Sequence, residues 1–100
     1  MKLLLIFLDE TDSFKDLPLY EAIVRRLQQL DIAGATVQRG IMGFGAHGRV
    51  HRKGLFGISD DRPVTISVVD DEERLREVLP EIRGMVQEGV LALLDAEVIA

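Results

Sequence analysis

The 100-residue sequence contains no cysteine, only five aromatic side chains, and no long hydrophobic run. Without cysteine the chain has no disulfide, no thiolate nucleophile and no cysteine-type zinc site, which is consistent with a reducing compartment. The longest apolar run covers residues 3–8 and is followed by Asp9 and Glu10. It is too short for the apolar region of a signal peptide or for the roughly 20 residues of a bilayer-spanning helix. We therefore expect a cytoplasmic protein with no membrane insertion.

Positive charge is also scarce over most of the chain. Twelve Lys and Arg face 17 Asp and Glu, which leaves a net charge of −5. An acidic chain does not adhere generally to nucleic acid, and the predicted strands after the first carry none of the aromatic side chains on which RRM-type domains stack bases. We expect no nucleic-acid partner. No serine has an evident histidine partner that would make it a nucleophile, so we predict no catalytic residue and no enzymatic activity.

The hydrophobic pattern indicates six elements in the order β-α-β-β-α-β. Strands are predicted over residues 3–8, 35–42, 64–69 and 91–99, and helices over residues 18–30 and from about residue 71 to residue 88, with Pro80 inside one continuous apolar period. This order is typical of the α+β ferredoxin-like fold, in which two helices cover one face of a four-stranded antiparallel sheet. We predict one domain over residues 1–100.

The other sheet face is predicted to stay open within one chain. This face is predicted to mix polar and apolar residues. Its polar residues are Thr36, Gln38, Thr65 and Ser67. Packing against another copy of the chain explains such a face.

The stretch from Arg39 to Gly54 is the part of the chain that this fold does not require. It holds five of the nine glycines, both histidines and four cations, with no carboxylate, so its local charge is +4. From residue 43 onward it belongs to a long loop, about residues 43–58, between the second and third predicted strands. Loops beyond about 12–15 residues are usually functional or disordered. Glycine lets the backbone approach a ligand closely, and exposed N–H groups beside arginine bind phosphate oxygens.

Gly43, Gly45 and Gly48 spell G-x-G-x-x-G, but the context excludes a dinucleotide fingerprint. No helix begins at the third glycine, and no Gly-Lys-Ser/Thr follows that would make a P-loop. Three interpretations remain open. The loop is a basic phosphate-binding loop, a flexible hairpin tip, or a metal or enzymatic site built on His47 and His51, although zinc sites normally have three or four placed ligands.

Several segments together resemble a known family. Pro18-Leu-Tyr-Glu-Ala-Ile-Val24, Ile32-Ala-Gly-Ala-Thr-Val37 and Arg39-Gly-Ile-Met-Gly-Phe-Gly45 look like the family called domain of unknown function 190, which itself resembles the PII signalling proteins. The likeness runs over nearly the full chain.

This resemblance implies a PII-like homotrimer whose open sheet faces meet at its centre, with a nucleotide cleft between subunits. The expected effector is an adenine nucleotide, with no tightly bound cofactor, and the expected partner is a protein such as a membrane transporter or an enzyme, contacted by the long loop. The ligand-binding residues carried over are Arg39, Gly40, Gly43, Phe44, Gly45, His47, Arg49 and Arg52. The loop has no tyrosine for uridylylation, and the chain has no recognisable second phosphate loop after the second predicted helix. A ligand-free trimer that docks a protein through the loop remains the alternative.

Overall fold

The computed structural model describes residues 1–45, 50–52 and 62–100. Its main elements are β1 (Lys2–Asp9), α1 (Leu19–Gln29), β4 (Thr36–Arg39), β7 (Pro63–Asp70), α2 (Glu72–Met85) and β8 (Val90–Asp95). Four short strands form two hairpins, β2 (Ser13–Phe14) with β3 (Leu17–Pro18) and β5 (Met42–Phe44) with β6 (Val50–Arg52).

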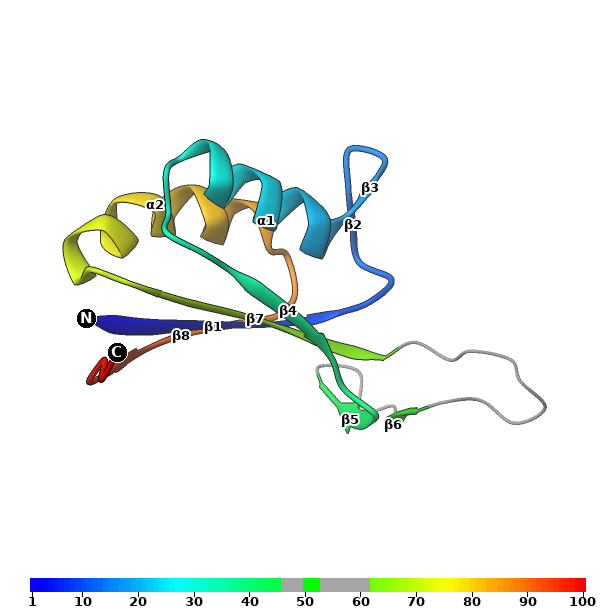
Figure 1. Cartoon of the computed structure of the whole chain (residues 1–100). Coiled ribbons are helices and arrows are strands. Elements are labelled where there is room, and N and C mark those ends of the chain that lie inside the picture. Colours follow the sequence, from blue (N-terminus) through cyan, green and yellow to red (C-terminus); the bar gives the residue numbers. More distant parts are fainter. Residues whose placement is uncertain (46–49, 53–61) are drawn as a thin grey trace.

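The four main strands form one antiparallel sheet in the order β4-β7-β1-β8. Both helices lie on the same face of this sheet (Figure 1). The predicted α+β ferredoxin-like fold is therefore confirmed. Among the described residues, no helix is long and apolar enough to cross a membrane.

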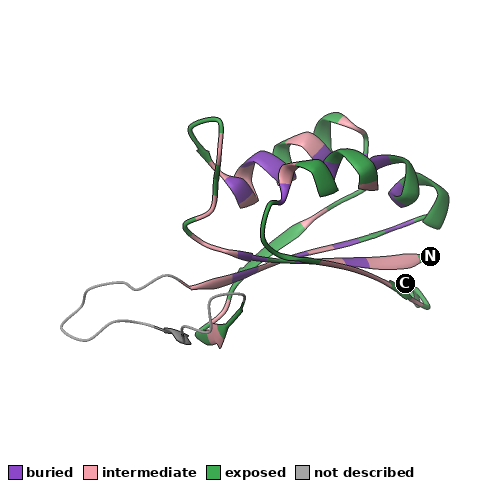
Figure 2. Ribbon diagram, turned by 180° about the vertical axis from the view of Figure 1, so that it is seen from behind, coloured by how far each residue is buried: buried purple, intermediate pink, exposed green. Residues whose placement is uncertain are grey.

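The core lies between the helices and the sheet, where the buried residues of both layers face one another (Figure 2). In β1 the buried side chains are Leu4, Ile6 and Leu8, at every second position, because successive side chains of a strand point to opposite faces. The helices contribute the buried positions of their apolar stripes, which are Leu19, Ala22, Ile23, Leu27, Leu75, Val78 and Ile82.

The opposite face of the sheet has no element over it among the described residues. Strand register places its side chains in two halves. The β1–β8 half is apolar and contains Leu3, Leu5, Phe7, Val90, Ala92 and Leu94, whereas the β4–β7 half is mainly polar and contains Thr36, Gln38, Thr65 and Ser67. Phe7 is 43% exposed. We call this surface the open face.

The structure differs from the sequence prediction mainly in its strand ends. The second and last main strands stop at Arg39 and Asp95, earlier than predicted, and the chain between β4 and β7 forms the β5–β6 hairpin. The helix α2 runs through Pro80 as a single element, as expected. Asp71 occupies its N-cap position without a side-chain capping bond. Strand ends depend on which neighbouring strand is available for pairing, and local sequence does not report that.

Candidate functional site

The long loop leaves the sheet at the end of β4. Arg39 is the last residue of that strand, and after two connecting residues the chain enters β5. β5 pairs with β6 through Met42–Arg52, Gly43–His51 and Phe44–Val50. This hairpin lies at the end of the sheet opposite to the two termini and on the side away from the helices (Figure 1). Any ligand or partner that binds at the loop base therefore meets the open-face side of the sheet.

Gly40 and Gly43 pack closely against Pro63, the first residue of β7. A Cβ on Gly40 would lie 2.7 Å from the Pro63 Cγ atom, and one on Gly43 would lie 3.0 Å from the same atom. The Gly40 N–H donates a hydrogen bond to the Pro63 carbonyl at 2.7 Å. Close packing against Pro63 therefore explains why these two positions are glycine. The sequence also predicts that their backbone lies close to a bound phosphate.

Gly45 differs from these two glycines. A Cβ built on it would meet no described atom within 4 Å. Its backbone is therefore open to a ligand on the part of the surface that the structure describes, and packing gives no reason for a glycine at this position.

Arg39 forms an ion pair with Glu10, with 2.5 Å between the arginine Nη2 and the carboxylate Oε1. Glu10 follows β1, and its backbone N–H donates to the Arg62 carbonyl at 2.8 Å, so the turn after β1 lies against the end of the loop. The Arg39 side chain remains 56% exposed. A phosphate that binds Arg39 must compete with Glu10. Asp9 and Glu10 follow the first apolar run in the sequence, but the sequence does not indicate that Glu10 pairs with Arg39.

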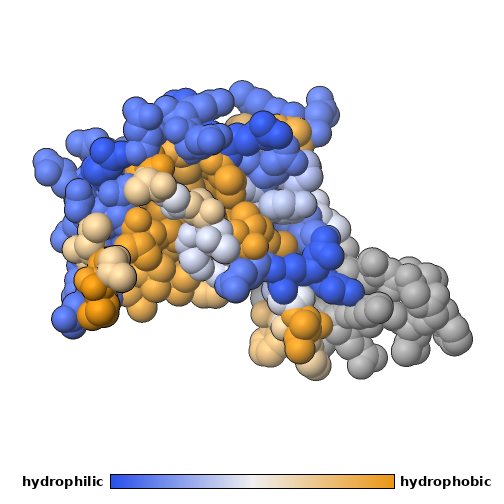
Figure 3. Space-filling view, in the orientation of Figure 1, coloured by the Kyte–Doolittle hydropathy of each residue, from blue (hydrophilic) through white to orange (hydrophobic). Residues whose placement is uncertain are grey.

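Exposed apolar side chains gather on the same hairpin. Ile41 is 85% exposed, Met42 is 60% exposed and Phe44 is 75% exposed. They form a hydrophobic patch at the lower edge of the molecule, beside the polar end of β4 (Figure 3). We call these three side chains the hairpin patch. Contiguous exposed apolar surface of this kind marks a binding surface more often than a structural one.

The remaining predicted ligand residues lie outside the described side chains. His47 and Arg49 fall among residues 46–49, which the structure does not describe, and only the backbone strand β6 is described for His51 and Arg52. Among the described residues no group of three or more carboxylate or imidazole ligands is close enough to hold a metal ion. The histidine site stays a prediction.

A hollow of about 370 Å³ lies between the turn after β1 and the C-terminal end of α2. Its lining includes Asp12 and Glu88 and no lysine or arginine. The negative charge of carboxylates in the lining repels a phosphate. The cationic loop base therefore suits an anion better than this hollow does.

The fold of the described residues is that of a known class of structures. The structure of CPII, described as a nitrogen regulatory PII-like protein from Thiomonas intermedia K12 bound to ADP, AMP and bicarbonate, is similar to this chain with a TM-score of 0.72. The match covers 97% of this chain and 86% of CPII at 23% sequence identity. The chain therefore has the PII-like fold.

The particular family follows from sequence. The model of the family DUF190, described as "Uncharacterized ACR", matches residues 1–98. The chain belongs to this family, and the predicted resemblance is confirmed.

Two relatives extend this result. A UPF0166 protein from Aquifex aeolicus (strain VF5) is 37% identical over 98 residues, which are 98% of this chain and 92% of the relative. A UPF0166 protein from Methanocaldococcus jannaschii is also 37% identical over 98 residues, which are 97% of this chain and 90% of the relative.

Proposed function

We propose that this protein is a non-enzymatic, PII-like regulator that binds an adenine nucleotide in a cleft between subunits of a homotrimer. The nucleotide changes the conformation of the loop at residues 43–58, and the loop controls a partner protein, such as a membrane transporter or an enzyme. The observation that carries this proposal is the +4 charge of residues 39–54 on an otherwise acidic chain, at a loop base where Arg39 is exposed. The similarity to CPII supports it, since that PII-like protein is described as bound to ADP and AMP.

The described side chains suit the two halves of a nucleotide. Arg39 supplies a planar cation that binds phosphate oxygens through paired N–H groups. Phe44 supplies an exposed aromatic face of the kind on which a base stacks. The open backbone at Gly45 allows close approach of a phosphate. Gly40, Gly43, His47, Arg49 and Arg52 complete the proposed contacts.

The open face supports the trimer. Its apolar half, on β1 and β8, would contact water in a single chain, although side chains such as Leu5 and Phe7 are ones that proteins bury. Packing of three open faces around one axis removes this surface from water, and the hydrophobic effect stabilises such packing. The polar half on β4 and β7 then lies toward the loop and the proposed cleft.

Regulation requires that the nucleotide bind two loop conformations with different affinity, since a ligand with equal affinity for both shifts neither population. The Arg39–Glu10 ion pair is one contact that nucleotide binding would exchange, because the phosphate and the Glu10 carboxylate compete for one guanidinium.

Thermal unfolding of the purified oligomer tests the proposal. ATP, ADP, AMP, cyclic nucleotides, S-adenosylmethionine and bicarbonate are added singly, with and without Mg²⁺, after the oligomeric mass is measured. A ligand at 100 times its Kd stabilises by about 2.7 kcal/mol per site, which raises the Tm by several degrees. We expect a selective shift with an adenine nucleotide. The Arg49→Ala/Arg52→Ala double variant should lose it, and Arg25→Ala, which removes an arginine from α1, should keep it. A double variant with unchanged affinity contradicts the proposed site.

The hairpin patch favours a second function. A trimer that docks a protein through Ile41, Met42 and Phe44 needs no small molecule. A flat ligand panel from an intact trimer, together with partner capture that is lost in a Phe44→Ser variant, would support this docking function.

A further inference from the structure

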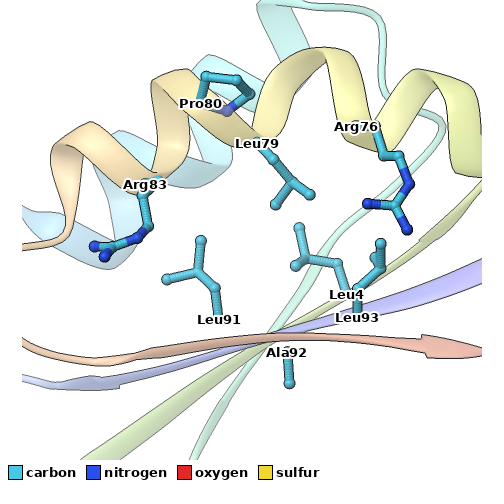
Figure 4. Close-up of a pocket in the computed structure, with 8 residues that line it drawn as sticks. All are labelled: Leu4, Arg76, Leu79, Pro80, Arg83, Leu91, Ala92 and Leu93. Atoms are coloured by element: carbon cyan, nitrogen blue, oxygen red, sulfur yellow. The ribbon is translucent and has the colours of Figure 1, made fainter.

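Another cavity, separate from the hollow beside the turn after β1, lies between α2 and β8, away from the β5–β6 hairpin. Its volume is about 430 Å³, and it is lined by Leu4, Arg76, Leu79, Pro80, Arg83, Leu91, Ala92 and Leu93. Figure 4 shows Leu79 pointing down from α2 and Leu91 and Leu93 pointing up from the sheet, with Arg76 at one end and Arg83 at the other. We call this cavity the edge groove. It is an apolar groove with a cation at each end.

The groove runs along an open edge of the sheet. β8 is the last strand in the order β4-β7-β1-β8, so in the described chain it has a partner only on its β1 side. Its six residues include no lysine, arginine or proline. Proteins usually protect an exposed edge by shortness, charge, proline or a bulge. The other edge strand, β4, follows that rule with only four residues, which include Arg39. β8 is longer, and its single charged side chain, Asp95, stands at its end, so residues 90–94 have none of these features.

Strand register identifies which backbone groups of β8 point outward. Lys2 pairs with Asp95, so Met1 and Ala96 are the next opposed residues, and the Ala96 N–H donates to the Met1 carbonyl at 3.2 Å. Hydrogen-bonded and non-hydrogen-bonded pairs alternate in an antiparallel ladder. Val90, Ala92 and Leu94 therefore bond to β1, whereas the N–H and C=O groups of Leu91, Leu93 and Asp95 face outward.

The outward backbone groups and the groove belong to the same residues. Leu91 and Leu93 turn their side chains up toward Leu79, and Figure 4 shows the Ala92 side chain pointing to the opposite face. Ala92 therefore lines the groove through its backbone. A strand added beside β8 would hydrogen-bond to the backbone of Leu91 and Leu93. Its side chains on the helix-covered face of the sheet would enter the groove.

We propose that β8 accepts an extended acidic peptide from a partner protein as a fifth strand of the sheet, with one apolar side chain in the edge groove and a carboxylate at each end. This inference does not depend on the proposed nucleotide function. Strand addition of this kind takes affinity from main-chain hydrogen bonds and specificity from alternate side chains.

Charge determines the peptide's sequence pattern. Arg83 makes no ion pair with any described residue, and Arg76 pairs only with Glu72 on its own helix, at 2.7 Å. The two arginines are seven positions apart on the helix, which corresponds to about 10 Å along its axis. On a strand, residues two positions before and after a central residue are about 13 Å apart. The long, flexible arginine and glutamate side chains can span the difference of about 3 Å between these two spacings. The predicted peptide pattern is therefore acid-x-apolar-x-acid. A fatty acid fills the groove but leaves the outward backbone groups without partners.

A labelled peptide tests the proposal on the native oligomer. The probe is a blocked, fluorescein-labelled heptapeptide, Thr-Glu-Thr-Leu-Thr-Glu-Thr, and binding is followed by fluorescence polarisation. We expect saturable binding, weakened about tenfold by Arg83→Glu and unchanged within about twofold by Arg25→Glu. Arg25 is the matched control because its side chain is 65% exposed on α1, away from the groove. The peptide with lysine in place of both glutamates should bind more weakly than the probe.

Amide hydrogen exchange supplies a second readout that does not depend on a protein variant. Peptide binding should slow exchange of the Leu91, Leu93 and Asp95 amides at least about tenfold and leave Ala92 and Leu94, already bonded to β1, unchanged. A peptide N-methylated on the amides that face β8 should not bind. No binding at about 1 mM peptide, or binding with no protection of these three amides, overturns the proposal. Displacement by decanoate without amide protection would assign the groove to a small amphiphilic anion, and cross-linking of β8 between copies would assign it to a subunit contact. Either result also overturns it.

Discussion

The carboxylate of Asp70 accepts a hydrogen bond from the backbone N–H of Ala33, with 3.0 Å between its Oδ2 atom and the nitrogen. Asp70 ends β7 and is only 5% exposed, and its Oδ1 atom accepts from the Asp71 N–H at 2.7 Å. Arg74 approaches the Oδ2 atom to 3.4 Å. Asp70 therefore ties the connection after α1 to the start of α2. It positions β4, the strand that leads into the cationic loop.

The pH dependence of stability should report this carboxylate. Burial alone would raise the pKa of Asp70, but the Ala33 and Asp71 N–H groups and Arg74 outweigh burial and lower it. A lowered folded-state pKa contributes stability above the unfolded pKa of about 3.9, and this is lost as the pH falls through the folded-state pKa. Asp70→Asn should cost about 1–3 kcal/mol at pH 7, because one amide group replaces an acceptor oxygen. This destabilisation should become smaller at acid pH, because the wild-type Asp70 carboxylate is then protonated as well.

Urea unfolding at a series of pH values measures this effect. Asp16→Asn is the control, since Asp16 is exposed and asparagine tolerates its positive φ of 69°. A cost for Asp70→Asn that does not change between neutral and acid pH would show that the ionised carboxylate is not the stabilising group.

Gly89→Ala should destabilise the fold at the turn between α2 and β8. Gly89 has a φ of +154°, and a Cβ there would lie 2.6 Å from the Phe7 carbonyl oxygen and 2.9 Å from the Val86 Cγ1 atom. We expect a loss of about 1–3 kcal/mol in the free energy of unfolding. In α2 a Cβ on Gly84 would meet no described atom within 4 Å beyond its own helical turns, so Gly84→Ala should stabilise by up to about 1 kcal/mol. Equal effects of the two variants on urea unfolding would contradict this assignment.

Two alanine variants separate the packing glycines from the ligand-binding glycine. Gly40→Ala places a Cβ against Pro63 and should lower stability, and Pro63→Ala in the same chain should recover part of the loss because it removes the Cγ atom. Gly45→Ala should leave stability within about 0.5 kcal/mol and weaken nucleotide binding. A double-mutant cycle in urea measures the first pair, and calorimetric titration with nucleotide measures the second. Additive effects of Gly40→Ala and Pro63→Ala would show that the contact does not explain the glycine.

Glu10→Gln should strengthen nucleotide binding. The substitution removes the charge that holds Arg39, so a phosphate no longer competes with a carboxylate for the guanidinium. Exposed ion pairs contribute about 0.2–1 kcal/mol, which predicts an increase of up to about fivefold in affinity. Glu21→Gln is the matched control, since Glu21 pairs with Arg25 at 2.7 Å on α1. Unchanged or weaker nucleotide affinity in Glu10→Gln would remove Arg39 from the proposed site.

Leu5→Lys should dissociate the proposed trimer. Leu5 lies in the middle of the open face, opposite Ser67 on one side and Ala92 on the other, so trimer packing would bury the lysine charge. Sedimentation equilibrium should change from three times 11.2 kDa to the single-chain mass. Gln38→Lys, at the polar margin of the same face, should keep the wild-type mass. A Leu5→Lys variant that remains trimeric would show that another surface forms the oligomer.

Much of the fold was predictable because each main element repeats its pattern many times. In β1 six consecutive apolar residues all indicate a buried strand. In α1 the repeat of Leu19, Ile23 and Leu27 at helical spacing indicates one buried helix face. The β5–β6 hairpin was not predictable in the same way. It has three residues in each strand, and its glycines favour a loop interpretation.

The sequence by itself determined the order of elements, the apolar layer between helices and sheet, and the placement of positive charge in one glycine-rich loop, since these follow from local composition and period. Only the tertiary structure decided that Glu10 meets Arg39, that Gly40 and Gly43 pack on Pro63, and that Arg76 and Arg83 line the groove beside β8. Each of these relationships joins residues from different elements or depends on which strand ends the sheet. Such contacts depend on register and helix rotation, which a local pattern does not specify.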